Sequence, residues 1–292
     1  MKNLMRSDIK GIMAMVVTSV CWSLSGLFIK LIDWHPITIA GARSLIAALF
    51  ILAVVRRPKL SFDKNQIVAA ISYSCTMLLF VYANKNTTSA NAILLQYGSP
   101  VYVMLLSGIM LKEKPLPEQI GALIAIVIGM CLFFADSLRL GHLNGDIAAV
   151  LAGMTFAIHT LFMRRQKEGS PIESLLISHG MTAIISLLIS IFLPPPIISK
   201  RSVAAIFGLG IVQIGFAAVF FSYAIKRISA IQSSLISIIE PALNPVWVYL
   251  AIGEKPSRLA ILGGVIIISA VVISSIFSVS RSSRALSIDR EE

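Results

Sequence analysis

The sequence is poor in charge and in cysteine. Only 13% of its 292 residues are charged and 57% are hydrophobic, whereas an average soluble domain has nearer a quarter charged residues. The three cysteines, Cys21, Cys75 and Cys131, all lie within apolar runs. An odd number of cysteines in separate apolar segments argues against a disulfide framework and against a zinc site.

Motifs of several enzyme and channel classes are also absent. There is no Walker A motif, so ATP is not expected to drive this chain directly. There is no HExxH or GxSxG motif, which argues against a hydrolase, and no glycine-rich selectivity filter, which argues against a channel. The net charge of +11 does not come from a basic stretch interleaved with aromatics, so nucleic acid is not an expected partner. We therefore expect a non-enzyme with no catalytic residue, metal site or cofactor.

Apolar runs of about 20 residues recur along the whole chain, and short charged clusters separate them. A helix of that length crosses the ~30 Å hydrocarbon core of a bilayer. Lys2, Arg6 and Lys10 precede a first run that is too long for a signal peptide, so this span is expected to stay. The pattern predicts an all-α polytopic membrane protein with ten transmembrane helices at 9–31, 36–55, 66–84, 90–111, 117–135, 145–164, 172–193, 202–223, 231–252 and 258–279.

The placement of Lys and Arg predicts the orientation of these spans. If the N-terminus is cytoplasmic, 17 of the 25 basic residues fall in cytoplasmic segments, 7 fall outside, and Arg43 lies within the second span. This bias favours a multi-pass protein of the plasma (cell inner) membrane with both termini in the cytoplasm. The Ser/Arg-rich segment 281–292 is predicted to be a disordered cytoplasmic tail.

The two halves of the chain resemble each other. Residues 82–115 align with 223–256 at a constant offset of 141, which pairs Pro100 with Pro241 and Glu113-Lys114-Pro115 with Glu254-Lys255-Pro256. A weaker match at an offset of 134 joins the first and sixth spans. Residues 1–140 and 141–280 are thus predicted to be two five-helix repeats. Because five is odd, the second repeat is inverted, which suits alternating access; duplication kept only for packing is the alternative.

The stretch from Asn84 to Tyr97, followed by Pro100, resembles the fourth-span signature of EamA-type permeases of the drug/metabolite transporter superfamily. With the ten spans and the Glu-Lys-Pro turns, the resemblance covers nearly the whole chain. It implies a secondary active transporter of a small metabolite, such as an amino acid or amine, that exports by alternating access with proton coupling or exchange. The alternatives are an uncoupled facilitator or a nucleotide-sugar-like exchanger and, less favoured, a membrane sensor or structural subunit. The expected partners are the small-molecule substrate, protons and the lipid bilayer, and the expected state is a monomer or weak homodimer.

Glu240 is the leading candidate for a substrate- or proton-binding residue. A carboxylate near the middle of a span costs about 2.5–3.5 kcal/mol on insertion scales, so it should face protein or water. Pro241 weakens the helix beside it. The spacing of 4, 3 and 4 residues predicts one polar stripe on the ninth span, formed by Ser233, Ser237, Glu240 and Asn244. Glu240 is expected to bind a cationic group or to exchange a proton; a carboxyl that only bonds a neighbouring helix is the structural alternative.

Other polar and aromatic side chains are weaker candidates. The fourth span, which aligns with the ninth, offers Asn91, Gln96, Tyr97 and Ser99 for the site or for interhelical hydrogen bonds. His159 and His179 fit either proton relays or neutral buried histidines. Stacking or hydrogen bonding to a ligand, with packing as the alternative, is assigned to Trp22, Tyr73, Tyr82, Gln213 and Trp247.

Two further features bear on packing. Arg43 fits snorkelling, an anionic substrate or, as the favoured interpretation, a structural pairing with a carboxylate. Gly121, Ala125 and Gly129 form a small-residue face on the fifth span that suits a close helix contact. Spans 3, 4, 8 and 9 are expected to wall a central cavity.

Overall fold

The computed structural model describes every residue except 1, 30, 137, 139–140, 254–256 and 289–292. The regular elements of this described part are helices: α1 Lys2–Ser23, α2 Ser25–Ile29, α3 Pro36–Val55, α4 Lys64–Asn86, α5 Ser89–Gln96, α6 Ser99–Met110, α7 Pro117–Phe134, α8 Leu143–Arg165, α9 Ile172–Ser190, α10 Lys200–Phe207, the π-helix η1 Gly208–Phe216, α11 Ala217–Ile225, α12 Ala230–Ser237, α13 Ile239–Ile252 and α14 Arg258–Ile288. They form ten segments that are long and apolar enough to cross a membrane. The predicted all-α polytopic fold is confirmed.

Three spans are interrupted rather than continuous. The first consists of α1 and α2, the fourth of α5 and α6, and the ninth of α12 and α13. The eighth is a continuous helix in which the π-helix η1 lies between α10 and α11. The interruptions of the fourth and ninth spans correspond in the repeat, because α5 shifted by 141 residues covers the same positions as α12. A helix break inside a membrane leaves backbone groups that need partners or water, so such breaks usually line a cavity.

Side-chain caps fix where several helices begin. The Thr88 hydroxyl accepts from the Asn91 amide at the start of α5, and Ser229 accepts from the Gln232 amide at the start of α12. Asp63 caps α4 in the same way, through the amides of Asn65 and Gln66. Such caps satisfy amides that have no partner within the helix.

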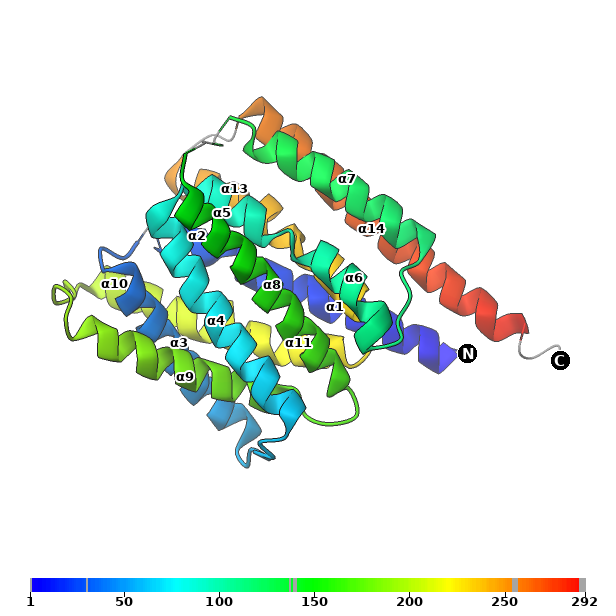
Figure 1. Cartoon of the computed structure of the whole chain (residues 1–292), viewed down its shortest axis with the longest axis horizontal. Coiled ribbons are helices and arrows are strands. Elements are labelled where there is room, and N and C mark those ends of the chain that lie inside the picture. The colour runs from blue at the N-terminus through cyan, green and yellow to red at the C-terminus, as the bar shows by residue number, and fades with distance from the viewer. Residues whose placement is uncertain (1, 30, 137, 139–140, 254–256, 289–292) are drawn as a thin grey trace.

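The bundle has two opposite ends (Figure 1). α1 begins and α14 ends at the same end, which we call the termini face; the other end is the far face. Successive spans run between these two faces. α4 packs against α8, α3 against α9 and α1 against α11, whereas α7 and α14 lie along each other at one side.

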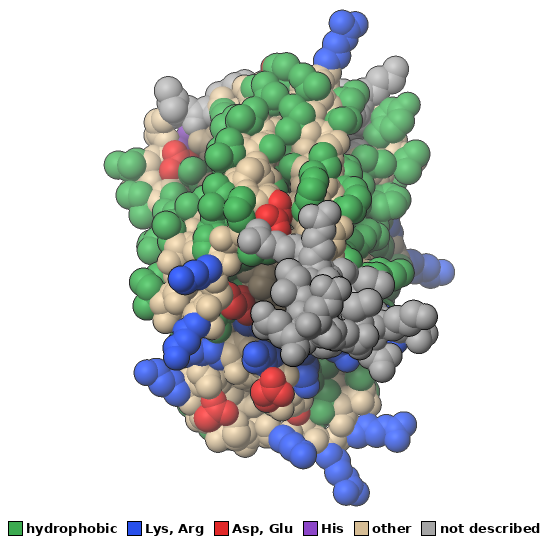
Figure 2. Space-filling view, turned by 90° about the vertical axis from the view of Figure 1, so that its right-hand side faces the viewer, with side chains coloured by type: hydrophobic (Ala, Val, Ile, Leu, Met, Phe, Trp, Pro, Cys, Tyr) green, Lys and Arg blue, Asp and Glu red, His purple; other side chains and the backbone are tan. Residues whose placement is uncertain are grey.

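The surface of the bundle suits a lipid environment. Large apolar side chains such as Leu105, Ile109 and Ile124 are 58–82% exposed, whereas serine and threonine side chains such as Thr18 and Thr182 are buried. Figure 2, which views the molecule from the right-hand side of Figure 1, shows hydrophobic side chains over the upper part and Lys and Arg gathered lower down. A band of exposed apolar side chains bordered by charge is typical of a protein embedded in a bilayer.

Small residues allow the close contact of α7 with α14. A Cβ atom built on Gly129 would lie 3.0 Å from the Gly263 carbonyl oxygen, and one built on Gly263 would overlap the backbone of Gly129. A Cβ on Gly121 would meet nothing within 4 Å. Only the Gly129 end of the predicted small-residue face is therefore used in this contact. α14 itself continues to Ile288, into the segment for which composition predicts disorder.

Candidate functional site

A central cavity of about 710 Å³ extends from the middle of the bundle towards the far face. Its mid-depth lining includes Arg43, Tyr73, Gln213 and Glu240, each near the centre of its span. Towards the far face the lining continues through the connection between α2 and α3 and the end of α4. The lining includes side chains from the predicted walls, spans 3, 4, 8 and 9, and also from spans 1, 2, 5 and 6.

Glu240 enters the cavity from the first turn of α13, directly after the interruption of the ninth span. The Tyr97 hydroxyl donates a hydrogen bond to its carboxylate. Asn244, one turn further along α13, lies against Gly26 of α2, where an added Cβ atom would overlap the Asn244 carboxamide. Glycine at position 26 is therefore needed for this close approach of α2 and α13.

The fourth span contributes three predicted residues to the cavity: Gln96, Tyr97 and Ser99. They surround the break between α5 and α6, so the two interrupted spans each bring their break to the same cavity. The Ser99 hydroxyl oxygen is buried without a hydrogen-bond partner in the described part of the chain. Ser99 and Glu240 occupy equivalent repeat positions, so only the second half supplies a carboxylate here.

Aromatic side chains form much of the remaining wall. Trp22 packs edge-on against Phe156, with ring centroids 6.1 Å apart. Both line the cavity, together with the neighbouring Phe133 and Phe134 of α7. Tyr73 also lines it and stacks on the buried ring of His159 at 4.4 Å. The wall is therefore mostly apolar, with a few polar groups placed at defined points.

Five predicted site residues lie outside the cavity lining. Ser233 is buried and donates to Met15 Sδ, Trp247 donates to Ser23 Oγ at 2.7 Å, and Asn91 donates to Asp146 at 3.1 Å. Tyr82 is 51% exposed on the outer surface. The fifth, His159, is fully buried, with its Nδ1 2.9 Å from the Ala69 carbonyl oxygen.

The predicted stripe on the ninth span is split for a geometric reason. Ser237, Glu240 and Asn244 line the cavity, but Ser233 does not. The prediction assumed one continuous helix, whereas α12 ends at Ser237 and α13 begins at Ile239. The interruption changes the direction in which residues before and after it point, so the spacing rule holds only on one side of the break.

Arg43 occupies a different environment from the one favoured by the sequence. It lines the cavity, its Nη2 lies 3.8 Å from Met77 Sδ, and its Nε is buried with no hydrogen-bond partner among the described residues. The ion pair described for this part of the chain joins Arg164 and Glu113, not Arg43 and a carboxylate. Methionine sulfur is only a weak acceptor, so the guanidinium is left available to the cavity.

Several cavity residues were not among the sequence-based candidates. Phe133, Phe134 and Phe156 carry no polar atom and sit in apolar spans, so nothing distinguishes them from packing residues. Asn84 had a detectable signal, because it belongs to the fourth-span signature and is polar at the end of a span. Its amide donates to the Phe80 carbonyl oxygen within α4.

On the termini-face side of the bundle lies a contact that we call the Glu113 clamp, formed by Glu113, Arg164, Ile225 and Ala230. Arg164 Nε lies 2.8 Å from Glu113 Oε1, and Arg164 Nη1 donates to the Ile225 carbonyl oxygen. Glu113 Oε2 accepts from the Ala230 amide, the first residue of α12. One carboxylate thus joins the end of the fourth span to the end of the sixth and the start of the ninth.

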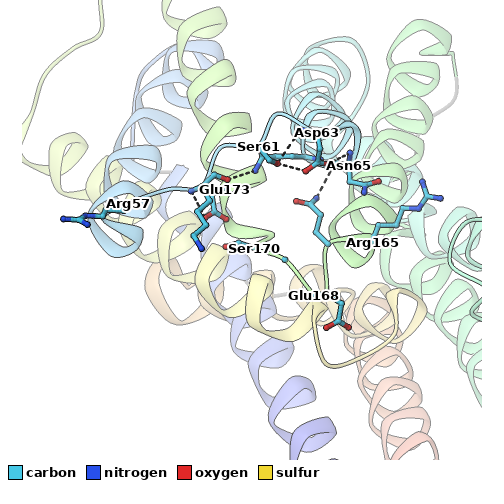
Figure 3. A pocket seen from close by; sticks show the side chains of 12 residues that line it. Arg57, Ser61, Asp63, Asn65, Arg165, Glu168, Ser170 and Glu173 are labelled. Atoms are coloured by element: carbon cyan, nitrogen blue, oxygen red, sulfur yellow. Dashed lines mark hydrogen bonds between the residues drawn. The ribbon is translucent and has the colours of Figure 1, made fainter.

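A second pocket of about 610 Å³ lies at the termini face, between the α3–α4 and α8–α9 connections (Figure 3). Glu173 Oε1 accepts from the Lys59 amide, and Asp63 accepts from Ser61 and from two amides of α4. These hydrogen bonds, with that from Ser61 first, lower the pKa of Asp63. Arg57 and Arg165 point away from each other in Figure 3, and the Lys59–Glu173 hydrogen bond joins the α3–α4 connection to the start of α9.

The described residues hold no group of three or more His, Cys, Asp or Glu side chains arranged to bind a metal ion. The cavity therefore offers hydrogen-bonding and charged groups together with aromatic surface. Those groups suit reversible binding of a small polar molecule.

Comparisons with known proteins point to transport. The model of the EamA-like transporter family matches residues 9–135 and 143–276. The uncharacterized transporter YoaV of Bacillus subtilis (strain 168) is 22% identical over 94% of this chain and 99% of its own length. The pseudopaline exporter CntI of Pseudomonas aeruginosa (strain UCBPP-PA14) is 24% identical over 91% of this chain and 95% of its own. A solved crystal structure matches with a TM-score of 0.82 at 17% identity, over 91% of this chain and 96% of the other, which shows a shared fold.

Proposed function

We propose, since the chain belongs to the EamA-like transporter family, that this membrane transporter is a secondary active exporter of a small metabolite such as an amino acid or amine. The family and its named relatives make it a multi-pass transporter rather than an enzyme. The observation that supports secondary active export is the asymmetric shape of the cavity. It reaches mid-depth from the far face, and its lining does not continue to the termini face, where the Glu113 clamp joins several spans.

A cavity open to one side and closed to the other is what one state of an alternating-access transporter requires. The matched interruptions of the fourth and ninth spans support the proposal of two related halves. The contact of Glu113 with Ala230 brings the end of the fourth span to the start of the ninth, so these two spans run in opposite directions. Opposite directions of equivalent spans are what an inverted repeat predicts.

The charge distribution supports a cytoplasmic termini face. Exposed basic side chains lie on the connections at this face, including Arg57, Lys59, Arg165 and Lys167. Figure 2 shows Lys and Arg side chains gathered on the lower part of the surface that it views. Basic residues favour the cytoplasmic side of a plasma membrane. In this orientation the cavity opens to the outside, as it would after an exporter has released its substrate.

Glu240 is the residue that we propose couples substrate export to proton import. A single carboxylate can hold a proton or the cationic group of a substrate, but not both at once. Competition between the two would link outward movement of substrate to inward movement of a proton. Exchange of one substrate for another fits the same site, because each substrate would occupy Glu240 in turn.

The rival transport functions fit less well. A nucleotide-sugar-like exchanger needs several basic groups for its phosphates, and the cavity lining described here includes one basic residue, Arg43. An uncoupled facilitator would not need an ionisable group at Glu240. The printed name of one relative, a pseudopaline exporter, favours export. A monomer or a weak homodimer remains our proposal for the assembly.

Reconstitution in liposomes tests this proposal. Vesicles with the purified protein would be loaded with a mixed pool of labelled amino acids and amines, and efflux would be measured with and without an inward proton gradient. We expect the gradient to accelerate efflux of a subset of the pool. Empty vesicles and vesicles treated with an uncoupler are the controls. Gradient-independent flux of every transported solute would favour the facilitator, and no flux in any condition would contradict the proposal.

A further inference from the structure

The cavity holds two opposite charges that attract each other but are not joined in an ion pair. Arg43 enters from α3 and Glu240 from α13, and both line the same space. Glu240 has the Tyr97 hydroxyl as its hydrogen-bond donor. Arg43 has only the Met77 sulfur at 3.8 Å, and no ion pair within 4.0 Å joins the two residues.

Both charges lie at a depth where a charge without a close partner is energetically costly. Each residue is at mid-depth of its span and is only partly accessible, and Arg43 Nε is fully buried without a partner. Charged groups in a low-dielectric interior are normally paired, because neither water nor a counter-charge otherwise replaces the lost hydration. Arg43 and Glu240 attract each other only at a distance, so a ligand that enters the cavity can supply the close counter-charge that each of them lacks.

Tyr73 lines the same cavity, and its hydroxyl is close enough to Arg43 and Glu240 to interact electrostatically with each. Gln213 and Ser99 add two more polar atoms in the lining, Oε1 and Oγ, that are buried and unpartnered among the described residues. The remaining wall is aromatic, with Trp22 and Phe156 facing the same space. The site thus combines a cationic point, an anionic point and an apolar surface.

We infer that the cavity selects zwitterions, with Arg43 binding the carboxylate and Glu240 the ammonium group of one ligand whose frame packs on the aromatic wall. The inference rests on the proposed transport function and narrows it: a free amine would leave Arg43 unpaired, and a simple carboxylate would leave Glu240 unpaired. A zwitterion satisfies both residues at once. Guanidinium also suits a carboxylate geometrically, because its donors form a bidentate fork.

Binding to the full-length protein in detergent tests this without requiring transport. Three probes share one frame: phenylalanine carries both charges, phenethylamine only the ammonium and 3-phenylpropionate only the carboxylate. Leucine, isopentylamine and 4-methylpentanoate repeat the series on an aliphatic frame. By calorimetry, we expect the zwitterion of at least one frame to bind ten times or more tighter than both of its partners, a difference of about 1.4 kcal/mol.

Substitutions test which residue binds which charged group of the ligand. Arg43→Gln should remove the advantage of the zwitterion over the amine, and Glu240→Gln should remove its advantage over the carboxylate. Arg43→Lys keeps the charge but not the fork, so a reduced advantage should remain, and this variant serves if Arg43→Gln does not fold. Arg57→Gln and Glu168→Gln remove the same charges from exposed sites away from the cavity and should leave the preference unchanged.

The outcomes separate this inference from the transport proposal. An amine or carboxylate that binds as tightly as its zwitterion, a preference that survives Arg43→Gln, or no binding by any of the six probes overturns the zwitterion site. Gradient-driven efflux of amines alone would do the same while leaving a transporter. Zwitterion binding without any flux in liposomes would instead support the site and contradict the proposed transport function.

Discussion

Glu240 differs from the other buried acidic side chains in what surrounds it. Glu173 is 2% exposed but accepts a backbone amide from a neighbouring connection, and Glu113 holds both a guanidinium and a backbone amide. Glu240 has a hydroxyl donor and faces the cavity. The first two carboxylates join elements of the fold, whereas the third faces the cavity, where we propose that it binds a ligand or a proton.

Replacing Glu240 with Gln tests that distinction. The amide keeps the shape of the carboxylate but cannot exchange a proton, so we expect proton-driven efflux to lose its dependence on the gradient. Exchange of bound substrate should continue at a reduced rate, because ammonium binding weakens. The measurement is counterflow and gradient-driven efflux across pH 5–8. Glu173→Gln, a buried carboxylate outside the cavity, is the matched control. Wild-type efflux at every pH would leave Glu240 with a packing role.

Where a local rule was enough, residues predicted from the sequence do line the cavity, although their role in binding stays a prediction. A carboxylate in mid-span is conspicuous, and Ser237 and Asn244 follow from helical spacing. Arg43 was equally conspicuous, but its partner depends on which helices meet, and sequence spacing within one span does not show that. Aromatic lining residues such as Phe156 were not recognisable, because the same residue type packs in every apolar helix.

At the scale of elements, the spans could be predicted because membrane thickness sets their length. Predicted and observed ends differ by only a few residues, as in 36–55 against Pro36–Val55 and 145–164 against Leu143–Arg165. The break in the ninth span was partly foreseeable from Pro241, which weakens the preceding turn. The π-helix Gly208–Phe216 was not, because it arises from how that span packs and carries no proline.

The contact of α7 with α14 provides a test at this scale with two adjacent glycines. Gly263→Ala places a Cβ against the backbone of Gly129 and Phe133, where no side chain can rotate away. Gly264→Ala meets only the Phe133 ring at 3.7 Å, an ordinary contact. Overpacking costs about 1–3 kcal/mol, so Gly263→Ala should lower the melting temperature by several degrees and Gly264→Ala should not. Equal effects of the two variants would contradict the close contact.

For the molecule as a whole, orientation depends on charges that lie outside the apolar spans. The connections at the termini face carry most of the exposed basic residues, and a charge bias of this kind sets topology during insertion. Sequence alone therefore predicts orientation, which the shape of the bundle does not encode. It does not predict which side the cavity faces, because the same chain must visit both states during transport.

Cysteine labelling in intact cells tests the orientation. In a variant with Cys21, Cys75 and Cys131 replaced by alanine, Ile197→Cys lies on the far face and Glu168→Cys on the termini face, and both sites are exposed. A membrane-impermeant maleimide should label position 197 directly. It should label position 168 only after permeabilisation. The reverse pattern would place both termini outside and turn the cavity towards the cytoplasm.

The Glu113 clamp connects the fourth, sixth, eighth and ninth spans at the termini face, so we expect it to help hold this side of the transporter shut. Arg164 and Glu113 are 13% and 21% exposed, which makes the pair only partly screened by water. Charge-assisted hydrogen bonds contribute about 1.5–3 kcal/mol each. Loss of one such hydrogen bond would therefore raise the fraction of molecules whose cavity is open to the termini face by roughly tenfold to a hundredfold.

Accessibility of Ser233 reports that opening. Ser233 is fully buried in the half of the ninth span that the clamp holds, so Ser233→Cys in the cysteine-free protein should react slowly with a maleimide. Glu113→Gln keeps an acceptor for the Ala230 amide but loses the ion pair, whereas Glu113→Ala loses both. Labelling should therefore become faster in the order wild type, Glu113→Gln, Glu113→Ala.

Arg164→Lys keeps the charge but not the fork that also reaches the Ile225 carbonyl oxygen, so it should fall between wild type and Glu113→Ala. The adjacent Arg165→Gln is the control, because Arg165 is exposed and lies over the Phe162 ring, 5.2 Å from its centroid. In the Arg165→Gln variant, Ser233→Cys should be labelled at the wild-type rate. Equal labelling rates of Ser233→Cys in all four clamp and control variants would contradict this role. The contact would then be a surface ion pair that does not hold the closed state, and apolar packing around Ser233 would have to keep the termini face closed.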